Sequence, residues 1–106
     1  MPANMTFETA WDRIQGCLLP GTSLSTFTKH KRTNRSFEIQ AVRPDAICVK
    51  GDRAKKEKWV PRREFEVVFP KWPAFRDAGV GRAELHKSIR HLTYIYSIFG
   101  WLESSS

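Results

Sequence analysis

The chain has 106 residues, of which 41% are hydrophobic and 27% are charged, and its 18 Lys and Arg against 11 Asp and Glu give a formal net charge of +7. This length predicts one domain, and the apolar fraction excludes an intrinsically disordered chain. No apolar run reaches the roughly 18–20 residues that span a bilayer, and the first twelve residues lack the layout of a signal peptide. We therefore expect a cytoplasmic protein without a membrane partner.

The N-terminal segment predicts an amphipathic helix over residues 6–19. Its apolar residues recur at helical spacing, namely Phe7, Ala10, Trp11, Ile14, Cys17 and Leu18. Thr6 suits the N-cap, and Pro20 with Gly21 ends the pattern.

The next segments indicate β-strands. Residues 37–41 alternate between apolar and polar side chains, and residues 47–50 do the same after a turn over 43–46 that contains Pro and Asp. Residues 24–29 before them and 58–60 after them are further strand candidates. The pattern predicts a three- to four-stranded antiparallel meander.

The C-terminal third indicates helices. A short helix is expected after Pro61, a polar helix over residues 82–90, and a last helix from about Thr93 to Leu102 that is apolar nearly all round. Together these elements predict one α+β domain over residues 1–103, with a C-terminal layer of two to three short helices. Residues 104–106 are expected to form a short disordered tail.

The positive charge is concentrated in one third of the chain. Residues 29–63 hold twelve basic and four acidic side chains, a net charge of +8, whereas the remaining residues sum to −1. A concentrated field of this kind attracts phosphates far more strongly than scattered charge does. The distribution favours a nucleic-acid partner, without distinguishing DNA from RNA.

The meander predicts where this charge gathers. Its first and third connections, taken as residues 29–35 and 50–58, lie at the same end of an antiparallel sheet. The predicted nucleic-acid-binding residues are Lys29, Lys31, Arg32, Arg35, Arg53, Lys55, Lys56, Lys58 and Trp59. Two alternatives stay open: the basic residues are solvated loop tips, and Trp59 is an inward core residue rather than a stacking surface.

The sequence contains no strong catalytic or metal-binding motif. Cys17 and Cys48 form no CxxC pair and lie near no histidine, so we interpret both as reduced core residues. His86 and His91 are five residues apart, which does not fit a zinc pair on one helical face. We expect no metal, no cofactor and no catalytic residue. A metal-independent ribonuclease that uses His30 and Glu38 is a third hypothesis, behind the two that follow.

Two functional hypotheses lead. The first is a small non-catalytic nucleic-acid-binding module that uses two basic loops at one end of the sheet. The second is a protein-interaction or oligomerisation module, such as a homodimer through the C-terminal helix, with Tyr94 and Trp101 on its interface.

Overall fold

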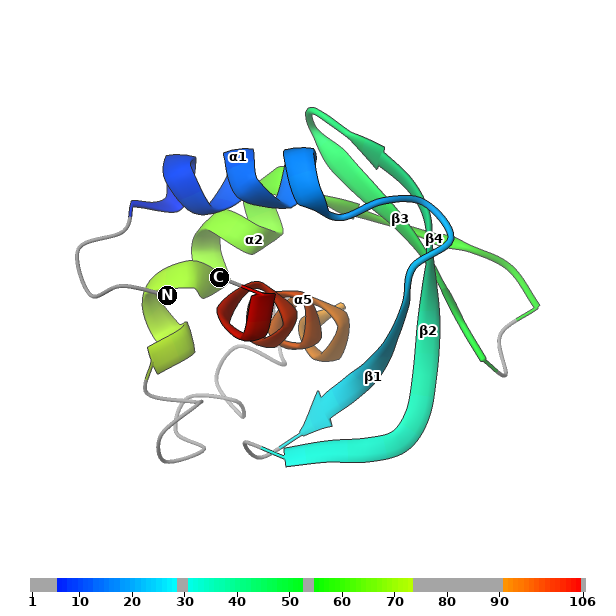
Figure 1. Ribbon diagram of the computed structural model, residues 1–106. Helices are drawn as coiled ribbons and strands as arrows, with labels where there is room; N and C mark the ends of the chain where they lie inside the picture. Colours follow the sequence, from blue (N-terminus) through cyan, green and yellow to red (C-terminus); the bar gives the residue numbers. More distant parts are fainter. Residues whose placement is uncertain (1–5, 29–30, 53–54, 74–90, 106) are drawn as a thin grey trace.

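The computed structural model describes residues 6–28, 31–52, 55–73 and 91–105, which form an α+β fold (Figure 1). In chain order the elements are α1 (Phe7–Cys17), β1 (Ser23–Thr28), β2 (Lys31–Arg43), β3 (Ala46–Gly51), β4 (Lys58–Pro61), α2 (Arg62–Val68), the 3-10 helix η1 (Phe69–Lys71) and α5 (Leu92–Ser105). The predicted N-terminal helix, meander and C-terminal helices are thus confirmed. The polar helix expected over residues 82–90 lies outside the described residues.

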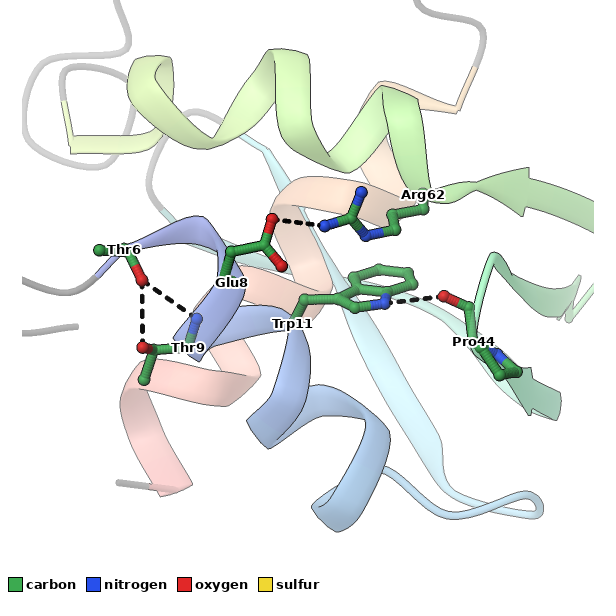
Figure 2. Close-up of polar contacts among 6 residues, drawn as sticks. All are labelled: Thr6, Glu8, Thr9, Trp11, Pro44 and Arg62. Carbon is green, nitrogen blue, oxygen red and sulfur yellow. Dashed lines mark hydrogen bonds and ion pairs between the residues drawn. The ribbon is translucent and has the colours of Figure 1, made fainter.

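Helix α1 begins and ends close to the positions that the sequence predicted. The side chain of Thr6 accepts a hydrogen bond of 3.2 Å from the backbone N–H of Thr9, which caps the first turn (Figure 2). Ala10, Trp11 and Ile14 are buried, as their spacing indicates. Cys17 was expected in the core, but it is exposed, because the last turn of α1 presents this position to solvent.

The sheet is a simple meander with strand order β1-β2-β3-β4, and every pair of neighbours is antiparallel. The predicted turn over residues 43–46 joins β2 to β3, where Arg43 and Ala46 are Cα partners. The β2–β3 register shifts between Ile39 and Ala41, so Gln40 is an extra residue on β2. Such a bulge turns two consecutive side chains, here those of Gln40 and Ala41, toward the same face of the sheet.

Strand β2 is much longer than predicted. The sequence indicated a loop over residues 29–35, but β2 already begins at Lys31, and Thr28 is the Cα partner of Lys31. The backbones of Lys31, Arg32 and Arg35 therefore lie in a strand and not in a loop. Figure 1 shows that β2 bends strongly, with its first residues below α5 and its later residues beside β3.

The core lies between the sheet and the helices. It is built mainly from residues of the sheet's helix-facing side, such as Phe37, Ile39, Val49 and Val60, and from α1, α2 and α5. Helix α5 lies within the curve of β1 and β2 (Figure 1), and the Phe99 ring meets that of Phe65 at 6.0 Å between centroids. None of the helices in the described parts of the chain is long and apolar enough to cross a bilayer.

The end of α5 also differs from expectation. The sequence predicted a disordered tail over residues 104–106, but α5 continues through Ser105. A contact from the residue after η1 holds this end of the helix, because the Trp72 indole Nε1 donates a hydrogen bond of 2.7 Å to Glu103 Oε1.

Candidate functional site on the outer face of the sheet

The two faces of the sheet differ in character. Side chains of Cα partners share a face, and side chains two residues apart on a strand share it too. By this rule the face away from the helices, here called the outer face, carries Ser23, Ser36, Glu38, Gln40, Ala41, Arg43, Cys48, Lys50 and Trp59. It therefore combines polar and charged side chains with one aromatic ring.

Trp59 is the main apolar feature of the outer face. Its side chain is 45% exposed, and its Cα partner is Cys48. The guanidinium carbon of Arg43 lies 5.3 Å from the centroid of the indole, a distance typical of a cation–π contact. The sequence left open whether the Trp59 side chain points into the core or outward. The inward orientation is wrong. The inward residue of β4 is Val60, which is fully buried.

Cys48 is the neighbour of Trp59 on the adjacent strand. It is 3% exposed although it belongs to the outer face, and it is the Cα partner of both Ala41 and Trp59. Burial raises the pKa of the Cys48 thiol, the negative charge of Glu57 raises it further, and Arg43 opposes both effects. Cys48 is thus a neutral packing residue, as predicted, but it supports the outer face rather than the core.

A polar hollow opens on the same face. It has a volume of about 370 Å³ and is lined by Ser23, Ser36, Phe37, Glu38, Gln40, Lys50, Gly51 and Asp52. Gln40 Nε2 donates a hydrogen bond of 2.5 Å to Glu38 Oε1. At the rim, the backbone N–H of Ser36 donates to Asp52 Oδ2 at 3.3 Å, and that of Asp52 donates to the Ser36 oxygen at 2.9 Å. These bonds hold the end of β3 against the middle of β2.

The structure separates the predicted basic residues into two groups. Lys55, Lys56 and Lys58 are exposed. Lys55 and Lys56 lie in the β3–β4 connection next to the outer face, whereas Lys58, at the start of β4, is the Cα partner of Val49 and lies on the helix-facing side. Lys31 and Arg32 pair with the end of β1 instead. Lys31 is five residues before Ser36, or roughly 16 Å of extended strand.

The remaining predicted basic residues are placed only in part. Arg35 precedes Ser36 on β2, close to the end of β3, whereas Lys29 and Arg53 lie outside the described residues. The two predicted loops thus do not form one loop cluster within the described residues. The first basic segment is mostly strand. It begins at Lys31, beside the end of β1, and not beside the β3–β4 connection.

Sequence reasoning missed two basic residues of the outer face. Arg43 belongs to the predicted turn over residues 43–46 and was not among the predicted binding residues, yet its side chain reaches Trp59 on β4. Lys50 was counted in the third connection, but it is a strand residue opposite Glu38. The alternation of residues 47–50 already placed Lys50 on the polar side, and this signal would have identified it.

The proposed interface residues of α5 are partly buried. Tyr94 and Trp101 both pack against the core, and the Tyr94 ring meets Phe37 edge-on at 4.9 Å between centroids. Their packing leaves only part of each side chain available to a partner. The homodimer through α5 remains a hypothesis, and the contacts of these two side chains do not favour it.

Two other expectations concern chemistry. The ribonuclease hypothesis used His30, which lies outside the described residues, and Glu38, which is exposed on β2. Glu38 is the Cα partner of Ser23 and Lys50 and lies seven residues from Lys31 along β2. Within the described residues, no group of three His, Cys, Asp or Glu side chains is placed to hold a metal ion.

Comparison with known proteins gave no further guide to function. No family model, curated protein or solved structure matches the chain.

Proposed function

We propose that the protein is a non-catalytic module that binds single-stranded nucleic acid on the outer face of its sheet. The observation that carries this proposal is the exposed ring of Trp59, which lies on a polar sheet face beside Arg43 and close to Lys50. An exposed aromatic ring on such a face offers a stacking platform for an unpaired base, and each base stacked in this way contributes about 1–3 kcal/mol.

Arg43 completes the platform. Its guanidinium already lies over the indole at 5.3 Å, and its side chain is otherwise exposed. A base that stacks on Trp59 takes the place of the guanidinium, which then lies beside the incoming sugar-phosphate backbone. Arginine binds phosphate strongly in this position, because its planar group donates several hydrogen bonds at once.

Exposed lysines surround the platform. Lys50 is on the outer face, and Lys55 and Lys56 lie at the end of the sheet next to it. Three acidic residues, Glu38, Asp52 and Glu57, lie among them, so the positive field is moderate rather than extreme. Lysines of this kind bind phosphates without reading sequence, whereas contacts to base edges select among bases.

The test is a titration of fluorescently labelled oligothymidine, followed by fluorescence anisotropy. Trp59→Ala should weaken binding by at least about fivefold, the lower limit for loss of one stacked base, and Trp59→Phe should retain part of the affinity. Leu19→Ala is the matched control, because Leu19 is 61% exposed and lies outside the sheet. Equal affinity of Trp59→Ala and the unchanged protein would overturn the proposal.

A further inference from the structure

We propose that the polar hollow beside Trp59 binds the base of a neighbouring nucleotide and selects guanine, an inference that rests on the proposed function. The hollow and the ring are adjacent on the outer face. Trp59 is the Cα partner of Cys48, and Lys50 follows two residues later on β3 and lines the hollow. Such diagonal neighbours are about 7–8 Å apart, so one strand of nucleic acid can use both sites.

The selectivity follows from a pair of residues that lie side by side on neighbouring strands and line the hollow. Glu38 and Lys50 are Cα partners, both are exposed, and within the described residues no ion pair joins them. A carboxylate offers acceptors only, and an ammonium group offers donors only. The hollow therefore presents adjacent acceptors and a donor to whatever enters it.

Guanine matches this arrangement better than the other bases. Its Watson–Crick edge presents O6 as an acceptor, followed by the N1–H and N2–H donors. Lys50 would donate to O6, and the Glu38 carboxylate would accept from both N–H groups. Uracil and thymine offer one donor between two acceptors, and adenine and cytosine offer a single amino donor. None of these gives the carboxylate two adjacent donors.

The hollow also fixes the carboxylate in position. Gln40 Nε2 donates to Glu38 Oε1, and these side chains share the outer face because they are two residues apart on β2. Asp52 already accepts a hydrogen bond from the Ser36 backbone. The two carboxylates repel a phosphate, so a base edge rather than the backbone is the group that enters.

The experiment compares the affinity for an oligothymidine of twelve nucleotides with that for the same oligonucleotide carrying one central guanosine, adenosine or cytidine. A single guanosine should raise affinity at least about fivefold, the lower end of the discrimination that a bidentate base contact gives. Glu38→Gln should remove this preference, because an amide has one acceptor and one donor. Glu66→Gln is the control, since Glu66 is exposed on α2 and its substitution changes the net charge equally.

The outcomes separate this inference from the proposed function. Two results would overturn the guanine site alone, provided that binding still depends on Trp59. One is equal affinity for the four oligonucleotides, and the other is a guanine preference that Glu38→Gln retains. A guanine preference that Glu38→Gln removes and Glu66→Gln retains would support it. Failure of every oligonucleotide to bind would overturn the proposed function itself.

Discussion

The indole Nε1 of Trp11 donates a hydrogen bond of 3.0 Å to the backbone oxygen of Pro44 (Figure 2). This bond joins α1 to the turn between β2 and β3, 33 residues later in the chain. Pro44 follows Arg43 directly, so the contact also fixes the end of β2 from which Arg43 reaches Trp59. The helix layer and the outer face of the sheet are thus linked through one turn.

Replacement of Trp11 by Phe should therefore destabilise the fold. Trp11 is 4% exposed, and its ring lies 5.0 Å from that of Phe65, so the variant loses a buried hydrogen bond and part of a packed ring. We expect a loss of about 1–3 kcal/mol in the free energy of unfolding, measured by urea denaturation. Trp59→Phe is the control and should change stability by less than about 0.5 kcal/mol. Equal effects of the two substitutions would contradict this account.

The two cysteines should differ sharply in reactivity. Burial raises the pKa of Cys48, so at pH 8 less of it is thiolate, whereas Cys17 is exposed. Iodoacetamide should therefore label Cys17 first, as followed by mass spectrometry of the folded protein. Trp59 is the Cα partner of Cys48 and shares its face of the sheet. Labelling of Cys48 should therefore accelerate in Trp59→Ala, which lacks the neighbouring indole. Unchanged Cys48 labelling in that variant would show that the indole does not protect the thiol.

The order of elements followed from local patterns. Alternation of apolar residues placed β2, β3 and the turn between them correctly, and Thr6 was identified as the N-cap of α1. The length of β2 could not be predicted, because residues 31–36 have the polar composition of a loop. These residues are in a strand because they pair with β1, and such long-range pairing overrides local propensity.

The candidate site was predicted in part. Lys55 and Lys56 are exposed beside the outer face, and Trp59 was named as a stacking residue with an inward core position as the alternative. Its orientation was harder to predict, because a shift of one residue in strand register exchanges the two faces. Trp59 and Val60 are consecutive, so only one can face inward, and pairing of Val60 with Ile47 decides which. No local pattern indicates the bulge at Gln40, which shifts the β2–β3 register next to the hollow.

Glu8 of α1 and Arg62 of α2 form an ion pair, and replacement of Arg62 should lower stability more than replacement of Glu8. Arg62 donates to Glu8 Oε1 at 2.7 Å (Figure 2). Its guanidinium carbon also lies 5.1 Å from the centroid of the Phe7 ring. Glu8 is 71% exposed, so Glu8→Ala should cost no more than about 1 kcal/mol. Arg62→Ala should cost more, because it also removes the cation–π contact and the packing of the side chain. Urea denaturation of both variants would decide, and a larger loss in Glu8→Ala would contradict the assignment.

Binding of single-stranded nucleic acid should depend steeply on salt. Three exposed basic residues, Arg43, Lys55 and Lys56, lie on or beside the outer face and outside the hollow. If each neutralises one phosphate, the slope of log K against log salt is about −2.1, or a loss of roughly 18-fold between 50 and 200 mM. Anisotropy titrations with oligothymidine at several salt concentrations would measure it.

Charge reversal identifies which lysines carry this salt dependence. The double variant Lys55→Glu, Lys56→Glu should make the slope shallower by about 1.4, because two phosphate contacts are lost. The double variant Arg63→Glu, Lys71→Glu is the matched control, since both residues are exposed in the helical layer and the net charge changes equally. Its slope should stay close to that of the unchanged protein. A slope that falls equally in both variants would indicate diffuse attraction by the net charge rather than contacts at the end of the sheet.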